Sequence, residues 1–223
     1  MTALIEKSLI QAKKHIREAA CLAKRSPDQI ILLAVSKRQP ISKLEAAIAA
    51  GQTHFGESQM QEALPKIQAI HHPQINWHFI GAVQSNKTRG IAESFDWLHS
   101  LASIKHAERL SAQRPDRLPP LNVCIQINTD AEETKAGIDF SEVDDFVEAV
   151  QALPGLRLRG LMCIPARENN REAFKKMQAC FLSLQQKRVE IDTLSMGMSD
   201  DFADAIASGS TMVRLGSAIF GSR

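Results

Sequence analysis

Residues 30–37 read IILLAVSK, a run of six apolar or β-branched residues followed by a serine and a lysine. Such a run is typical of a buried strand in a parallel sheet. Helical periodicity separates it from seven further runs of strand character, at 53–56, 76–80, 96–99, 121–127, 157–162, 192–195 and 211–215. Eight strands that alternate with helices predict an α/β fold, a (β/α)8 barrel of the TIM type.

The alternative architecture is an open, doubly wound sheet. No GxGxxG motif follows the first run, and the runs are short enough for a small barrel, so the barrel is favoured. An additional N-terminal helix is expected before it, because apolar residues recur every three or four positions up to the turn at 26–28. The length suits one barrel and no low-complexity linker divides the chain, so we expect residues 1–223 to form a single domain.

The composition argues against several classes of function. Lysine and arginine number 27 and aspartate and glutamate 25, and the resulting formal net charge of +2 offers no strong field to nucleic acid or to an anionic membrane. No stretch predicts a signal peptide or a membrane span, so we expect a cytoplasmic protein. The four cysteines are far apart and form no CxxC pair, so we expect no metal site.

Lys37 is the first candidate for chemistry, because ligands of such barrels bind at the carboxyl ends of the strands. It follows an apolar strand, where burial would lower the pKa of its ammonium group. A neutral amine can attack an aldehyde. The alternative is a lysine that lies along the surface with its charge in water.

The loops after the last two expected strands, SMGMSDD (195–201) and RLGSAIFG (214–221), lie where barrels commonly bind phosphate. Gly197 and Gly216 would let the backbone approach an anion, and Ser199 and Ser217 offer hydroxyl donors. Each glycine alone fits an ordinary turn equally well. Together with Lys37, the two loops predict a site for an aldehyde that carries a phosphate.

The sequence resembles the YggS/PROSC family of pyridoxal phosphate homeostasis proteins over nearly its whole length. The stretches that carry the resemblance are LLAVSKRQP (32–40), HFGESQMQEA (54–63), WHFIGAVQSNK (77–87), INTDAEETKAGI (127–138), GLMCIP (160–165) and LSMGMSDDFADAIASGSTMVRLGSAIFG (194–221). Two positions depart from the family pattern: Ser58 replaces the usual asparagine, and Ser217 replaces the usual threonine.

The resemblance implies a barrel similar to the N-terminal domain of alanine racemase, with pyridoxal 5'-phosphate held as a Schiff base on Lys37. It also implies that Arg214 lies against the pyridine nitrogen. The alternative for Arg214 is a structural arginine in a salt bridge. The remaining cofactor contacts expected from the resemblance are Met198, Ser199, Gly216 and Ser217.

Three classes of function are open: a cofactor carrier or buffer, a weak amino-acid racemase or decarboxylase, and a protein scaffold. Racemases of the related fold use a lysine and a tyrosine as bases. This sequence has no tyrosine and ends eight residues after the last expected strand, without the separate β domain that supplies that tyrosine. A guanidinium at the pyridine nitrogen would also weaken the ring as an electron sink.

We therefore expect a monomeric carrier without catalytic residues, with pyridoxal phosphate-dependent apoenzymes as candidate partners. If the chain is an enzyme instead, the candidates for its second base are His78, His99 and Cys163.

Overall fold

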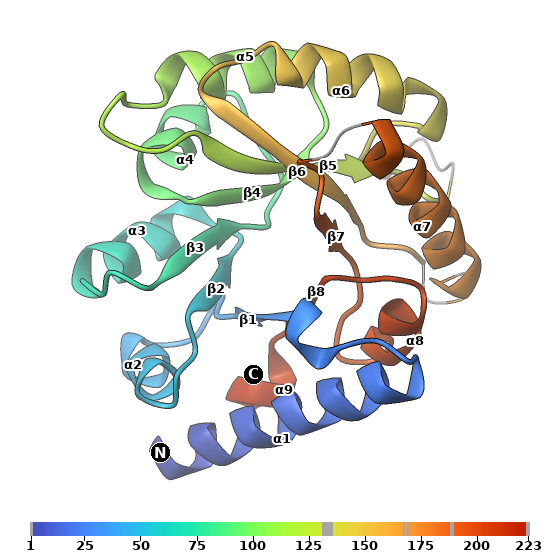
Figure 1. The fold of residues 1–223 in the computed structure, drawn as a ribbon. Coiled ribbons are helices and arrows are strands. Elements are labelled where there is room, and N and C mark those ends of the chain that lie inside the picture. The colour runs from blue at the N-terminus through green and yellow to red at the C-terminus, as the bar shows by residue number, and fades with distance from the viewer. Residues whose placement is uncertain (1, 131–135, 167, 169, 188–189, 222–223) are drawn as a thin grey trace.

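The computed structural model describes residues 2–130, 136–166, 168, 170–187 and 190–221, and its strands form a closed parallel barrel in sequence order (Figure 1). The strands are β1 (Ile31–Val35), β2 (His54–Glu57), β3 (Asn76–Phe79), β4 (Trp97–Leu101), β5 (Leu121–Ile127), β6 (Leu156–Cys163), β7 (Thr193–Ser195) and β8 (Met212–Leu215). Every predicted run agrees with its strand to within two residues at either end. The barrel prediction is confirmed, and the open sheet is wrong.

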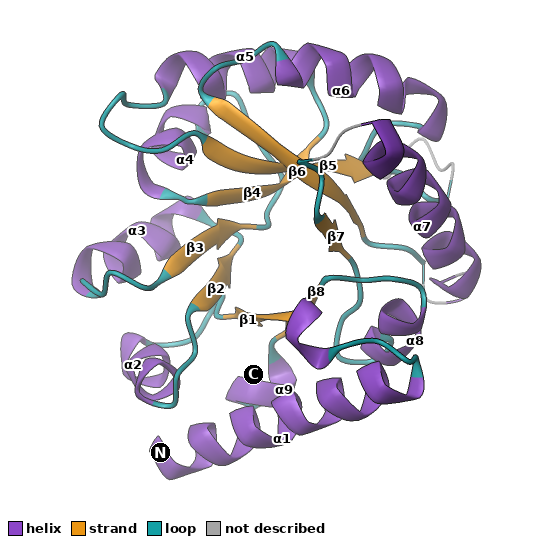
Figure 2. Ribbon diagram, viewed as in Figure 1, coloured by secondary structure: helices purple, strands orange, loops and turns teal. Residues whose placement is uncertain are grey.

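Helices cover the outside of the barrel (Figure 2). They are α1 (Thr2–Leu22), α2 (Ile41–Ala49), α3 (Met60–Ala69), α4 (Thr88–Ser94), α5 (Ile104–Gln113), α6 (Val143–Gln151), α7 (Asn170–Lys187), α8 (Phe202–Ala207) and α9 (Ser217–Phe220), with 3-10 turns η1 (Pro27–Gln29) and η2 (Phe140–Glu142). Within the described ranges, none of the helices is both long and apolar enough to cross a membrane.

The predicted N-terminal helix is confirmed as α1, which packs against α2, α8 and α9 (Figure 1). Its apolar face buries Ile5, Leu9 and Ile16, three of the residues whose spacing indicated the helix. This contact holds the first and last helices together beside β1 and β8. The carboxyl end of β1 and the loop after β8 are thereby supported from outside the barrel.

The barrel interior is more polar than the layer around it. One large apolar cluster joins the helices to the outer face of the sheet, whereas the buried apolar cluster inside consists of Trp97, Cys124 and Met162. His78 stacks on Trp97 with 5.2 Å between ring centroids, and both His78 and His99 are completely buried. Branched aliphatic residues usually dominate such interiors. The imidazoles here must therefore satisfy their hydrogen bonds within the barrel.

Candidate functional site

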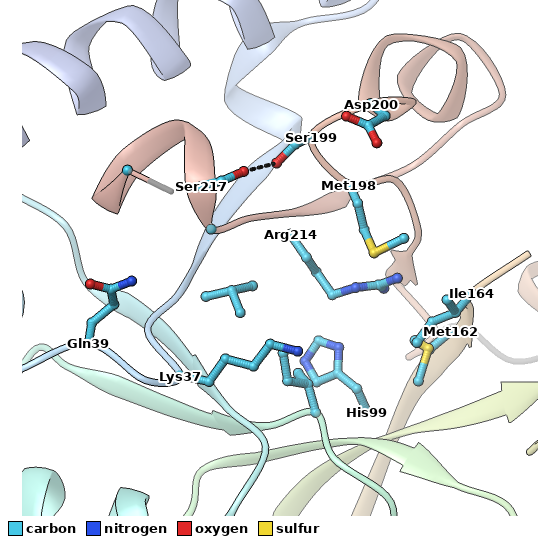
Figure 3. Close-up of a pocket in the computed structure, with 14 residues that line it drawn as sticks. Lys37, Gln39, His99, Met162, Ile164, Met198, Ser199, Asp200, Arg214 and Ser217 are labelled. Atoms are coloured by element: carbon cyan, nitrogen blue, oxygen red, sulfur yellow. Dashed lines mark hydrogen bonds between the residues drawn. The ribbon is translucent and has the colours of Figure 1, made fainter. Parts of the chain in front are cut away.

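A cavity of about 550 Å³ lies at the carboxyl ends of the strands. This volume is ordinary for a small-ligand or cofactor site. The residues that the sequence indicated as cofactor contacts all line it: Lys37, Met198, Ser199, Arg214, Gly216 and Ser217. Figure 3 shows the Lys37 side chain extending into the cavity, with the guanidinium group of Arg214 and the ring of His99 around its inner end.

A buried ion pair supports the backbone just before Lys37. Glu57 Oε1 accepts hydrogen bonds from Ser36 Oγ at 2.6 Å and from Lys66 Nζ at 2.8 Å, and the same ammonium donates to the backbone oxygen of Ser36 at 2.9 Å. Burial raises the pKa of Glu57, while the bonds from Lys66 and Ser36 lower it. Removing one partner of such a buried pair typically costs about 3–5 kcal/mol. The base of Lys37 is therefore rigidly held.

The residue after Lys37 is fixed as well. Arg38 adopts a left-handed conformation, with φ of 61°, and its backbone N–H donates to Glu62 Oε1. Its side chain is exposed. The turn places the lysine toward the cavity and the arginine toward solvent, which favours the cavity interpretation of Lys37 over the surface alternative. The lowered pKa expected for Lys37 stays a prediction.

Arg214 is a buried cation whose hydrogen-bond acceptors are neutral. Its Nη1 donates to the backbone oxygen and to Oγ of Ser195, both at 2.8 Å, and Nη2 donates to the backbone oxygen of Cys163 at 2.8 Å. Among the described residues, no ion pair includes Arg214. The salt-bridge alternative therefore finds no support in them. Burial lowers the pKa of this guanidinium, so an electron-rich ligand in the cavity would stabilise its charge.

Two hydroxyl groups face each other at one end of the cavity. Ser199 Oγ and Ser217 Oγ are 3.5 Å apart, and Figure 3 places them away from Met162 and Ile164. Ser217 is also the first residue of α9, and the first amides of a helix have no acceptor within it. This end of the cavity therefore presents several hydrogen-bond donors to an anion.

The two glycines of these loops serve different purposes. Gly197 has φ of +95°, and a Cβ there would lie 2.6 Å from the Cβ of Ala205 in α8. It does not line the cavity, which favours the turn alternative, and its expected approach to an anion stays a prediction. Gly216 does line the cavity, and a Cβ on it would lie 3.3 Å from the backbone oxygen of Val35. Its small size therefore allows β8 to end close against β1.

The candidate second bases are poorly placed for that role. His99 lines the cavity, but its Nδ1 is 2.9 Å from Ser195 Oγ and its Nε2 is 2.9 Å from His78 Nδ1. His78 is completely buried and lies outside the lining. Burial raises the pKa of Cys163 to about 12, and this thiol does not line the cavity either.

The structure describes Ser58 but not Lys135. Ser58 lies outside the cavity lining, and its backbone oxygen would be 2.1 Å from a Cβ on Gly81, so this segment instead contacts the loop after β3. Lys135, in the stretch 127–138, lies outside the described residues. No group of histidine, cysteine, aspartate or glutamate side chains in the described part of the chain could hold a metal ion.

Sequence reasoning missed several residues of the cavity lining: Val35, Gln39, Ile80, Met162, Ile164, Asp200 and Gly221. A signal existed for Met162 and Ile164, because alternate residues at the end of a strand point the same way. Gln39 and Asp200 lie in loops, and no periodic pattern could have indicated them.

Comparisons with known proteins define first the class of barrel and then the family. Residues 12–223 match the family described as alanine racemase, N-terminal domain. The chain is 50% identical to the pyridoxal phosphate homeostasis protein of Escherichia coli K12, covering 98% of this chain and 97% of that protein. The protein of the same name from Pseudomonas aeruginosa is 48% identical, with 98% and 96% covered. The chain belongs to the family of pyridoxal phosphate homeostasis proteins.

Solved structures agree with this assignment. PipY of Synechococcus elongatus, in a structure with PLP bound, has a TM-score of 0.79 and 34% identity, covering 92% of this chain and 100% of that one. An alanine racemase from Clostridium difficile shares the fold, with a TM-score of 0.77 at 14% identity, and this chain covers 57% of it.

The buried histidines predict a loss of stability in acid. Burial, with the charge of Arg214, lowers the pKa of His99 to about 3, and burial also lowers that of His78, whereas an unfolded histidine titrates near about 6.5. Between these values the unfolded state binds more protons, so the free energy of unfolding falls as pH falls. Urea unfolding from pH 7 to 4 should show a loss of up to about 1.4 kcal/mol per pH unit for each such histidine.

The variant His99→Asn should show a shallower acid slope than the wild-type protein. Burial raises the pKa values of Glu57 and Asp96, which affect the pH dependence with the opposite sign. Their contribution cancels when the two proteins are compared at each pH. Equal slopes in both proteins would contradict the prediction.

Proposed function

We propose that this chain binds pyridoxal 5'-phosphate in the cavity and acts in intracellular cofactor homeostasis as a carrier or buffer. The observation that carries the proposal is the joint position of Lys37, Arg214, Ser199 and Ser217 around one cavity. These residues offer an amine, a guanidinium donor and two hydroxyl donors, which match the aldehyde, pyridine nitrogen and phosphate of the cofactor. The names of the relatives and the PipY structure with PLP bound support it.

Each residue has a distinct part in this proposal. Lys37 would hold the cofactor as a Schiff base, because its primary amine can react with the aldehyde that the cofactor would supply. Arg214 can only donate hydrogen bonds, so it favours an unprotonated pyridine nitrogen. Ser199 and Ser217 donate to the phosphate, which can also approach the backbone of Gly216. The side chain of Met198 lines the cavity and is 37% exposed, so it would contact the cofactor from the open side.

A carrier accounts for these residues better than an amino-acid enzyme does. The 223 residues contain no tyrosine, and His78 and Cys163 lie outside the cavity lining. An unprotonated pyridine nitrogen is a weak electron sink, which disfavours carbanion chemistry. Racemase or decarboxylase activity remains the alternative that experiment must exclude.

The proposal extends to the whole chain. Residues 1–223 act as one cofactor-binding domain, as a monomer in the cytoplasm, and deliver the cofactor to pyridoxal phosphate-dependent apoenzymes. Domain unity is supported by the contact of α1 with α8 and α9, which ties the two ends of the sequence together. The oligomeric state, the location and the apoenzyme partners stay predictions.

The first test concerns Lys37. Borohydride treatment of the loaded protein should fix a phosphopyridoxyl group on the peptide that contains Lys37, as read by mass spectrometry. Lys37→Ala should lose the absorbance of the bound cofactor. Lys37→Arg is the matched control, because it keeps the positive charge but has no primary amine. Modification of Lys66, Lys135 or another lysine in the wild-type protein would contradict the assignment.

The second test concerns the phosphate. A hydrogen bond to a charged group contributes about 1.5–3 kcal/mol, so Ser199→Ala should weaken cofactor binding roughly ten- to a hundredfold in a fluorescence titration. Ser103→Ala, which changes a hydroxyl outside the cavity lining, should leave the Kd unchanged. Pyridoxal without phosphate should bind much more weakly to the wild-type protein. Equal Kd values for the two compounds would remove the phosphate site.

The third test separates carrier from enzyme. The loaded protein, incubated with L-alanine, L-lysine or L-ornithine in deuterated water, should produce no D-isomer, no decarboxylated amine and no turnover-level deuterium at Cα. It should activate a cofactor-free transaminase faster than a scavenger captures spontaneously released cofactor. Racemisation or decarboxylation that Lys37→Ala abolishes would favour the enzyme instead. Activation no faster than release to the scavenger would reduce the role to a buffer.

A further inference from the structure

Three histidines form a continuous hydrogen-bonded chain inside the barrel. His54 Nδ1 lies 2.9 Å from His78 Nε2, and His78 Nδ1 lies 2.9 Å from His99 Nε2. His99 Nδ1 is in turn 2.9 Å from Ser195 Oγ, which accepts a hydrogen bond from Arg214 Nη1 at 2.8 Å. The chain therefore crosses from β2, β3 and β4 to β7 and ends on the buried guanidinium.

The two ends of this chain lie at different openings of the barrel. His99 lines the cavity at the carboxyl ends of the strands. His54, at the start of β2, is partly exposed and lines a separate cleft of about 310 Å³, together with Lys13 and Arg17 of α1 and Asp28 of η1. A continuous set of hydrogen bonds thus connects the amino end of the barrel to the proposed cofactor cavity.

Counting hydrogens gives the chain a direction. Each neutral imidazole has one N–H and one acceptor nitrogen, and each contact has room for one hydrogen. All three rings must therefore carry their proton on the same nitrogen, either Nδ1 in every ring or Nε2 in every ring. Burial keeps these imidazoles neutral by lowering their pKa values. One ring cannot change its tautomer unless the others change theirs.

Arg214 selects one of the two directions. Its guanidinium can only donate, so Ser195 Oγ accepts from it and has one hydrogen left to donate. If that hydrogen goes to His99 Nδ1, every ring carries its proton on Nε2, and each contact in the chain has a donor and an acceptor. In the reverse direction, Ser195 accepts twice and its hydroxyl needs a third partner, which the hydrogen bonds of the described residues do not provide. The first direction satisfies more of the buried groups.

We propose that His54, His78 and His99 are positioning residues that fix the hydrogen-bond direction at Ser195, and thereby the guanidinium of Arg214, from the amino end of the barrel. A change at His54 is transmitted to the cavity through the buried rings of His78 and His99. The hydrogen-bonded chain of histidines does not depend on any ligand, whereas its effect on cofactor binding rests on the proposed function.

The direct test is the tautomeric state of His99 in ligand-free, 15N-labelled protein. Long-range 1H–15N NMR spectra should show His54, His78 and His99 each as a single Nε2–H tautomer, with scalar couplings across both N–H···N bonds. In His54→Phe, the buried Nε2–H of His78 loses its acceptor, so His99 should shift to the Nδ1–H form or to a mixture. A His99 that keeps the wild-type 15N shifts in this variant would overturn the proposal.

Two further variants keep the test decisive. His106→Phe removes an imidazole that bonds only Ser85 among the described residues, and it should leave His99 unchanged. A shift of His99 in this control would show that the effect is not specific to the chain and would count against it. If His54→Phe does not fold, His54→Leu gives the same readout, because a leucine side chain also has no acceptor for the Nε2–H of His78.

A cofactor titration then tests the consequence for the cavity. Loss of one neutral hydrogen bond changes binding by about two- to tenfold, so His54→Phe should weaken pyridoxal 5'-phosphate binding by that factor while His106→Phe should not. Unchanged affinity in His54→Phe would overturn the link to the cavity. Wild-type protein that binds no pyridoxal 5'-phosphate would overturn the proposed function, and the NMR result would still decide whether the histidine chain exists.

Discussion

The pairing of β1 with β8 is the contact on which the site depends. Leu33 lies opposite Arg214 and Ala34 opposite Leu215, so the first and last strands of the sequence are neighbours. This register places the lysine that follows β1 beside the loop that follows β8. Gly216 permits the close approach, since any side chain there would press against Val35. An open sheet built from the same strands would leave the amine and the guanidinium at opposite edges.

Buried charged side chains beside the β1–β8 pairing make the site rigid. Lys66 and Glu57 are removed from water together, and their bonds to Ser36 fix the backbone that precedes Lys37. Arg214 is removed from water with only neutral acceptors, which hold its guanidinium in one orientation. A buried charge without full compensation is costly, so both arrangements favour a single geometry over several. That geometry is preorganised for a ligand with an acceptor at one end and an anion at the other.

Local sequence signals predicted the parts of the site that lie at strand ends. Lys37, Ser199 and Ser217 lie in the loops that follow β1, β7 and β8, and parallel strands bring such loops to one face of the barrel. The same reasoning could not assign a role to Gly197, because a glycine required by a tight turn and by the packing of α8 looks identical in sequence to one required by an anion. The pyridine contact expected for Arg214 came from the resemblance to a family, because no spacing rule could have predicted it.

The sequence by itself determined the eight strands, the helices between them and the N-terminal helix, because hydrophobic periodicity is a local property that follows from the geometry of each element. Only the tertiary structure decided which polar residues meet. His54, His78 and His99 lie on three different short strands, and nothing in their neighbourhood in sequence indicates a partner. Their contacts depend on the curvature and register of the closed barrel, which all eight strands set together.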